Sequence, residues 1–375
     1  MKPIRIAVLL VILNAVACTS PEEGSPPIAG RFEVETTIPL PGGTFALLYN
    51  ALDNKVYSAN RDENSVTIVD GASNQVLATV SVPKGPRQFI QDPIRDLIYT
   101  ADYFDDLISI IDGKTNQIAG TLPSGDGPRD FAYNFQDEKV YCANEFSNDV
   151  TVIDAKTQSM IATVPVGDTP RVLCYNPSND TVYSANTKSG TLTVIDGKSD
   201  QVVVTIKVGS IPKVLIHNPQ NNKIYCSNYG SDSVSIINAV NNEVLSTVAV
   251  GDGPSELFYD AVNNNVYCAI IGEPGIGHRN DVVMVIDGAT DELSQLAAED
   301  EPMSFASLPT PNLVVWANEW SDSVSVIDGA AKTMLDIIKV GRQPVDVVSN
   351  PHNNRVYAGS GLGESITVLI WRPGG

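Results

Sequence analysis

The fold is decided by one stretch, residues 170–209: PRVLCYNPSNDTVYSANTKSGTLTVIDGKSDQVVVTIKVG. Its apolar residues form four short runs that are rich in Val, Ile, Thr and Tyr, and such runs predict β-strands. We expect strands near 171–175, 181–185, 192–195 and 201–208, joined by turns rich in Asn, Asp, Gly and Pro. Four strands in a unit of about 40–45 residues are typical of one propeller blade.

Copies of this unit fill nearly all of the chain after residue 31. Residues equivalent to Pro170, Tyr183 and Thr205 recur every 42 residues in one phase. Such a period indicates a propeller, a solenoid or an array. We expect blades at 41–85, 86–127, 128–169, 170–211, 212–253, 254–301 and 302–343, and a last copy from 344 to 371.

The last copy lacks its fourth strand. Residues 32–40 carry Thr37 in phase with the fourth-strand threonines of the other copies. We therefore expect this N-terminal segment to join three C-terminal strands, because closing the ring removes exposed sheet edges. The prediction is one all-β domain over 31–375, an eight-bladed propeller of four-stranded antiparallel blades. A seven-bladed ring that leaves one copy unused is the alternative.

The N-terminus predicts export. Lys2 and Arg5 precede an apolar run at 6–13 that is too short to span a bilayer, and small residues then lead to Cys18. This pattern resembles a bacterial lipoprotein signal: 1–17 would be the signal peptide, Cys18 the lipidated residue and 18–30 a flexible tether. An ordinary secretory peptide is the alternative. The expected location is the cell envelope, either periplasmic or on the outer surface, with membrane contact only through the anchor.

Net charge and cysteine spacing exclude several classes of function. The 375-residue chain carries a net charge of −20, which argues against nucleic acid as a partner. Cys142, Cys226 and Cys268 share one place in the repeat, so we expect them to be small buried side chains. Whether Cys142 and Cys174 form a disulfide stays open. The absence of CxxC and CxxCH argues against thiolate zinc and covalent haem, and we expect no metal or other cofactor.

Three blades carry a recognisable motif: a Tyr-x-Ala-Asn or Trp-Ala-Asn strand end, then a strand ending in Ile-Asp, in blades 128–169, 170–211 and 302–343. The motif residues are Tyr141, Ala143 and Asn144; Tyr183, Ala185 and Asn186; and Trp316, Ala317 and Asn318. The pattern over about 32–371 resembles the YVTN β-propeller repeat of archaeal surface-layer proteins and bacterial periplasmic proteins of the YncE type. The resemblance implies the fold. It implies little about function, since related propellers range from lactonases to dehydrogenase subunits.

Candidate ligand-binding residues fall in slots that face the mouth of the central channel. The slot after the repeated proline holds cations in four consecutive blades, which are Arg87, Arg129, Arg171 and Lys213. Arginine's planar fork suits carboxylate or phosphate. The alternative is that these cations pair with Asp126, Asp130 and Asp168.

A second slot, in the loops after the second strand, holds the aromatic residues Phe104, Phe146 and Trp320 close to Asn144 and Asn186. Such rings stack on ligands or cap the layers between blades.

Blade 254–301 departs from the pattern through a longer loop that contains His278 and Arg279. We expect this loop to be a lid or a partner contact, with a tolerated surface insertion as the alternative.

The preferred interpretation of the whole chain is a monomeric, non-enzymatic binding scaffold whose channel mouth takes a protein, a glycan or a small anionic ligand. An enzyme that acts on an anionic substrate, of lactonase or lyase type, and a purely structural surface-layer module are the alternatives.

Overall fold

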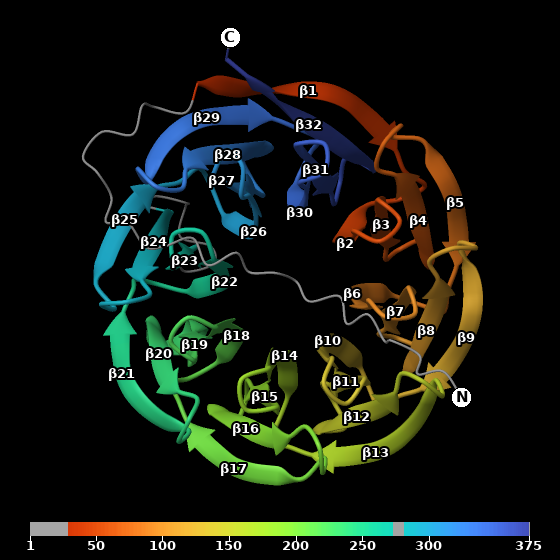
Figure 1. Cartoon of the computed structure of the whole chain (residues 1–375), viewed down its shortest axis with the longest axis vertical. Helices are drawn as coiled ribbons and strands as arrows, with labels where there is room; N and C mark the ends of the chain where they lie inside the picture. The colour runs from red at the N-terminus through yellow and green to blue at the C-terminus, as the bar shows by residue number, and fades with distance from the viewer. Residues whose placement is uncertain (1–28, 273–280, 375) are drawn as a thin grey trace, which may run out of the picture.

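The computed structural model describes residues 29–272 and 281–374, and within these ranges the chain forms eight four-stranded antiparallel sheets arranged in a ring. In each sheet the strand nearest the central channel comes first in the repeat and the outermost comes last (Figure 1). The prediction of an eight-bladed all-β propeller is therefore confirmed, and the seven-bladed alternative is wrong.

Seven blades are made of consecutive strands. Blades 1 to 4 are β2 (Thr44–Asn50), β3 (Lys55–Asn60), β4 (Ser65–Asp70), β5 (Val76–Ser81); β6 (Pro86–Asp92), β7 (Leu97–Asp102), β8 (Leu107–Asp112), β9 (Gln117–Pro123); β10 (Pro128–Asn134), β11 (Lys139–Asn144), β12 (Asp149–Asp154), β13 (Ser159–Pro165); and β14 (Pro170–Asn176), β15 (Thr181–Asn186), β16 (Thr191–Asp196), β17 (Val202–Lys207). Blades 5 to 7 are β18 (Pro212–Asn218), β19 (Lys223–Asn228), β20 (Ser233–Asn238), β21 (Glu243–Ala249); β22 (Pro254–Asp260), β23 (Asn265–Ile270), β24 (Val282–Asp287), β25 (Leu293–Ala297); and β26 (Pro302–Leu308), β27 (Leu313–Asn318), β28 (Ser323–Asp328), β29 (Thr333–Lys339). A short 3-10 turn, η1 (Tyr229–Ser231), follows β19.

Blade 8 is composite, as the sequence predicts. Its order is β1 (Gly30–Pro39), β32 (Ser365–Pro373), β31 (Arg355–Ser360) and β30 (Pro344–Asn350). Thr37 pairs with Thr367, just as Thr205 pairs with Thr193 in blade 4. The N-terminal strand therefore occupies the position of the missing fourth strand.

The repeated tyrosine is buried between neighbouring blades, and in some blades its hydroxyl also bonds to the next blade. Tyr141 is fully buried, and its hydroxyl donates to the Asp200 carboxylate (2.6 Å) in the β16–β17 turn of the following blade. Tyr357 bonds from blade 8 to Gly71 O of blade 1 (3.1 Å). The hydroxyls of Tyr57, Tyr99 and Tyr267 are buried without a hydrogen-bond partner among the described residues. The repeated copies therefore share burial of the phenol ring, and the bond to the next blade is added in only some of them.

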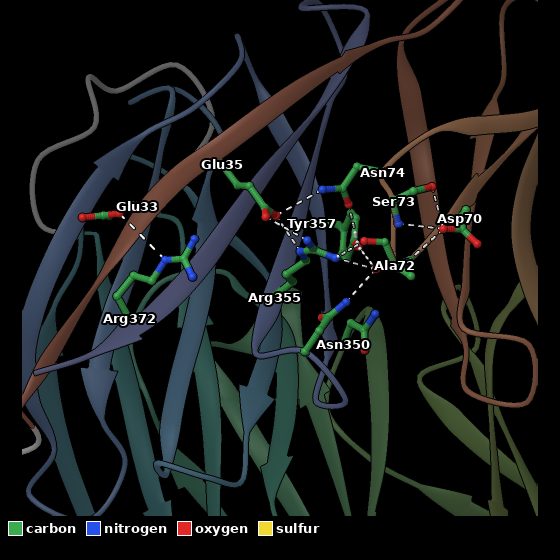
Figure 2. A network of polar contacts seen from close by, with 12 residues as sticks. Glu33, Glu35, Asp70, Ala72, Ser73, Asn74, Asn350, Arg355, Tyr357 and Arg372 are labelled. Carbon is green, nitrogen blue, oxygen red and sulfur yellow. Dashed lines mark hydrogen bonds and ion pairs between the residues drawn. The ribbon is translucent and has the colours of Figure 1, made fainter.

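The ring is sealed by a polar junction between blade 8 and blade 1 (Figure 2). Glu35 is the extra residue of a bulge in β1, and its carboxylate accepts from Arg355 Nη2 of β31 at 2.8 Å. The same guanidinium donates to Gly71 O (2.7 Å) and Ala72 O (2.9 Å) in the β4–β5 turn. One side chain therefore ties together the N-terminal strand, the C-terminal sheet and the first blade.

We expect Arg355→Ala to lower the free energy of unfolding by about 1–3 kcal/mol, because it removes the charged donor that the Glu35 carboxylate and the Gly71 and Ala72 carbonyls share. Arg372→Ala is the matched control, since Arg372 lies 4.0 Å from Glu33 and is exposed. Urea unfolding of both variants measures the difference. Equal loss in the two variants would contradict a sealing role for Arg355.

The junction also predicts a pH dependence. The hydrogen bond from Arg355 holds the pKa of Glu35 below its usual value, although burial opposes it. The stabilisation is therefore fully present above the ordinary glutamate pKa and is lost as the pH falls through the lowered value. Accordingly, the cost of Arg355→Ala should shrink in acid.

Candidate functional site

The face of the ring that carries the predicted residues is built by two kinds of loop. In blades 2 to 8 the loop after the second strand bonds to the link that precedes the first strand. Tyr103 N donates to Gly85 O (3.1 Å) in blade 2, and Glu145 N donates to Gly127 O (2.9 Å) in blade 3. This pairing places the residue after the second strand beside the residue after the repeated proline. We call the surface formed by these loops and links the mouth.

The four predicted cations occupy equivalent places at the mouth. Arg87, Arg129, Arg171 and Lys213 are each the second residue of an innermost strand, β6, β10, β14 and β18, and each is half-buried. Strands β6, β10, β14 and β18 follow one another around half of the ring (Figure 1). The repeat therefore produces an arc of positive charge in a strongly acidic protein.

Blades 1 and 2 join two arginines to three aromatic rings. The Arg61 guanidinium carbon lies 4.9 Å from the Phe45 ring and 5.3 Å from the Phe104 ring. The Arg87 guanidinium carbon lies 4.8 Å from Phe45 and 4.8 Å from Tyr103. Tyr103 and Phe104 meet edge to face at 5.2 Å, so the five side chains form a closed cluster. We call it the arginine–aromatic cluster.

The two guanidinium groups of this cluster share Phe45 but have no acidic partner. Within the described ranges neither Arg61 nor Arg87 forms an ion pair, and Arg61 Nε is buried without a hydrogen-bond acceptor. Burial, followed by repulsion from Arg129 and Arg61, lowers the pKa of Arg87 to about 10, so it stays cationic at neutral pH. Aromatic faces attract a cation, yet they leave its N–H donors without conventional acceptors.

Arg129 and Arg171 are paired instead, and both bind Glu145. Arg129 Nη1 lies 2.6 Å from Glu145 Oε2, and Arg171 Nη2 lies 2.7 Å from Oε1. The Tyr103 hydroxyl donates to the same carboxylate at 3.0 Å. Burial alone would raise the pKa of Glu145, but the two arginines and Tyr103 outweigh it and hold that pKa below its usual value. The alternative, in which these cations pair with neighbouring acids, therefore holds for Arg129 and Arg171, but their partner is Glu145 and not Asp126, Asp130 or Asp168.

Lys213 is the fourth cation of the arc. Its ammonium lies 5.0 Å from the Tyr229 ring, and burial lowers the pKa of Lys213. Two half-buried carboxylates, Asp130 and Glu256, line the innermost strands β10 and β22. Burial raises the pKa of Asp130 to about 6 and that of Glu256 to about 7, although Lys213 opposes the shift at Glu256. Burial therefore raises the pKa of two acids on the innermost strands of the ring that also carries the arc of cations.

The predicted aromatic residues are exposed on the mouth. The exposed fractions are 56% for Phe104, 63% for Phe146 and 55% for Trp320. Phe104 and Phe146 belong to adjacent blades, and Phe146 lies 5.8 Å from the same Tyr103 ring that Phe104 contacts. Trp320 lies in the loop after β27 of blade 7, apart from this pair.

Glycine makes room for these rings. Gly85 and Gly127 lie in the links before β6 and β10 and have φ of +74° and +69°. A Cβ at these positions would lie 2.5 Å from Phe104 and 2.7 Å from Phe146. Both the backbone conformation and the close approach therefore require glycine beneath the exposed rings.

Asn144 and Asn186 do not belong to the mouth surface, so their prediction as ligand-binding residues is corrected. Both are fully buried. Asn144 Nδ2 donates to Asp149 (2.6 Å) and Thr151 (2.9 Å), and Asn186 Nδ2 donates to threonines of β16. These amides bind the third strand of their own blade, which is a packing role that every such copy can share. His278 and Arg279 lie outside the described residues.

Metal and thiol chemistry find little support in the described part of the chain. Residues 29–272 and 281–374 contain no group of three or more His, Cys, Asp or Glu side chains placed to hold a metal ion. Cys142, Cys174, Cys226 and Cys268 are free thiols, which answers the open question about a disulfide, and burial raises the pKa of each. No helix among these residues is long and apolar enough to cross a membrane.

Sequence reasoning missed three residues of the site: Arg61, Tyr103 and Glu145. All three occupy one slot, the residue directly after the second strand of blades 1, 2 and 3. A comparison of that slot across blades would have found them. Phe45 occupies the blade 1 position of the slot that holds cations in blades 2 to 5. The sequence does not show that Arg61 and Arg87 both lie against the Phe45 ring.

Comparisons with known proteins bear on the fold alone. No protein-family model matches the sequence, and a search of curated proteins returns no match. Among solved structures, a chain of "Kuenenia stuttgartiensis Hydrazine Synthase" has a TM-score of 0.62 at 17% sequence identity. The alignment covers 93% of this chain and 98% of that chain. At this identity the likeness supports the propeller architecture and carries no activity from one protein to the other.

Proposed function

We propose that the protein is an exported, lipid-anchored binding scaffold whose mouth takes an anionic ligand, or an anionic group on a partner protein or glycan. Export and the anchor rest on the N-terminal sequence and Cys18, which lie outside the described residues. The binding role rests on the mouth. It is a proposal for a binding protein rather than an enzyme.

One observation carries the binding role: the arginine–aromatic cluster holds two guanidinium groups on one phenylalanine ring, and neither of them forms an ion pair with a described residue. Like charges held this close repel each other, and Arg61 contributes to the lowered pKa of Arg87. Half-buried cations normally have an acidic partner, because an unpaired charge away from water is costly. An oxyanion from outside would supply that partner.

A purely structural ring would be expected to pair its mouth cations internally. Arg129 and Arg171 follow that expectation through Glu145. Arg61 and Arg87 depart from it, although acidic residues are abundant in the sequence. This contrast between neighbouring blades supports a ligand site at blades 1 and 2 more than a structural module.

The test is isothermal titration calorimetry of the protein with inorganic phosphate at constant ionic strength. We expect the double variant Arg61→Gln, Arg87→Gln to bind phosphate at least about tenfold more weakly, which corresponds to the loss of about 1.4 kcal/mol of charged hydrogen bonding. Circular dichroism would confirm that the variant remains folded.

The matched control removes two charges from the opposite face. Lys156 and Lys198 are exposed residues of the β12–β13 and β16–β17 turns. Lys156→Gln, Lys198→Gln changes net charge equally and should leave phosphate affinity unchanged. Equal weakening in both double variants would mean that net charge, and not the mouth, governs binding, and the proposal would fail.

A further inference from the structure

We infer that the mouth selects an oxyanion carried on a flat aromatic ring, so that the arginine–aromatic cluster holds the anion and Phe104 and Phe146 hold the ring. The inference rests on the proposed function and makes it narrower. It concerns the chemical class of the ligand, an aromatic carboxylate or a molecule of the same shape and charge.

The N–H donors of Arg61 and Arg87 that have no acidic acceptor indicate that the ligand carries an anionic group. Arg61 and Arg87 each lie over two aromatic rings, and neither donates a hydrogen bond to an acidic side chain within the described ranges. A guanidinium carries five N–H donors in a planar fork. The aromatic rings cover the faces of each guanidinium group. Its N–H donors point outward in the plane of the group, so an acceptor can reach them at the edge. A planar carboxylate matches that edge in bidentate fashion.

The ring half is set by two exposed aromatic side chains that are held in place. Phe104 packs edge to face on Tyr103 at 5.2 Å, and Phe146 lies tilted on the same ring at 5.8 Å. Both also sit over glycines whose Cβ would collide with them. Fixed rings lose little conformational entropy when they bind, and a stacked aromatic pair adds binding free energy beyond that of the buried area.

A sugar would also stack on these rings, but polar side chains in the same loops are already engaged by the backbone. Asp105 accepts from Lys84 N at 2.8 Å, Asp106 from Gly127 N at 2.8 Å, and Ser147 from Asp126 N at 3.0 Å. Sugar hydroxyls would have to share these side chains with the backbone. An apolar aromatic ring needs no polar partner, and this difference favours the aromatic ring.

Titration calorimetry with four probes tests the inference on the intact protein: 2-naphthoate, acetate, 2-naphthol and glucuronate. We expect 2-naphthoate to bind at least about tenfold more tightly than acetate, 2-naphthol or glucuronate. Acetate lacks the ring, 2-naphthol lacks the charge, and glucuronate replaces the aromatic ring with a sugar.

Variants separate the two halves of the site. Phe146→Ala should weaken 2-naphthoate several-fold and leave inorganic phosphate unchanged, because Phe146 contacts Tyr103 and is not one of the rings that Arg61 and Arg87 lie over. Phe135→Ala is the matched control, because Phe135 is 52% exposed in the β10–β11 turn on the opposite face. It should change neither affinity.

The outcomes distinguish the inference from the function on which it rests. If acetate and 2-naphthoate bind equally, the ring selectivity is wrong while anion binding stands. If glucuronate binds more tightly than 2-naphthoate, the ligand class is an acidic sugar and the inference is overturned. If neither phosphate nor any of the carboxylates binds, the proposed function itself fails.

Discussion

Replacement of Glu145 by Ala is expected to lower the free energy of unfolding by about 2–4 kcal/mol. The side chain of Glu145 is only 4% exposed and accepts from Arg129, Arg171 and Tyr103. Its removal leaves two guanidinium groups close to Arg87 without a counter-ion. Because Arg171 is 37% exposed, solvent screens part of the penalty, and we place the effect below that of a fully buried pair.

Two further results should accompany this loss. Phosphate should raise the melting temperature of Glu145→Ala more than that of the wild type, since an external anion then replaces the lost carboxylate. The lowered pKa of Glu145 means that its stabilising effect is present above the ordinary glutamate pKa and declines as the pH falls through the lowered value. A variant that is as stable as the wild type at pH 7 would show that Glu145 does not hold the arc together.

The opposite sign is expected for Asp102→Asn, which should raise the free energy of unfolding at pH 8 by about 2–4 kcal/mol. Asp102 ends β7 in the slot where other blades carry Asn60, Asn144, Asn186, Asn228 and Asn318. It is fully buried and accepts from Ser109 Oγ at 2.6 Å, while Oδ1 has no partner among the described residues. An amide at this position would donate to Ser109 as its counterparts donate in other blades.

The sign of the pH dependence follows from the pKa. Burial raises the pKa of Asp102 to about 8, although the bond from Ser109 opposes the shift. In the unfolded chain the group ionises near its ordinary value, so the folded state loses relative stability as the pH rises toward 8 and then levels off. The benefit of Asp102→Asn should accordingly be small at pH 4 and largest at pH 8.

Urea unfolding at pH 4 and pH 8 measures this difference, and Asn60→Asp is the reciprocal control. Asn60 Nδ2 donates to Ser65 (3.1 Å) and Thr67 (2.7 Å) in a buried site of blade 1. A carboxyl placed there should create the same alkaline loss of stability. An Asp102→Asn variant with no gain at pH 8 would mean that the native carboxyl is not kept neutral by its surroundings.

The architecture was predictable because the residues that repeat are the residues that build it. Tyr141 joins adjacent blades through Asp200, so its recurrence reports the blade period directly. The closure was predictable for a related reason: Thr37 keeps the phase of a fourth strand, and it does pair with Thr367.

The proposed site was only partly predictable because its residues break the repeat. Arg87, Arg129, Arg171 and Lys213 were found since four blades place a cation in one slot. The sequence did not single out Arg61, Tyr103 and Glu145, because the slot that they share holds a different residue type in each blade. Their contacts also depend on the length of each side chain, which the repeat pattern does not describe. Asn144 was misplaced for the opposite reason. It recurs in many blades, and that recurrence reflects its bonds within the sheet.

The central claim is that an external anion completes the charge balance at Arg61 and Arg87. The most direct measurement is an anomalous difference map, at the selenium edge, from crystals of the protein soaked in sodium selenate. The account predicts a selenium peak within hydrogen-bonding reach of the Arg61 and Arg87 guanidinium edges, and a much weaker peak or none in crystals of Arg61→Gln, Arg87→Gln. Selenate found only away from the mouth, with the arginine–aromatic cluster intact and accessible, would contradict it.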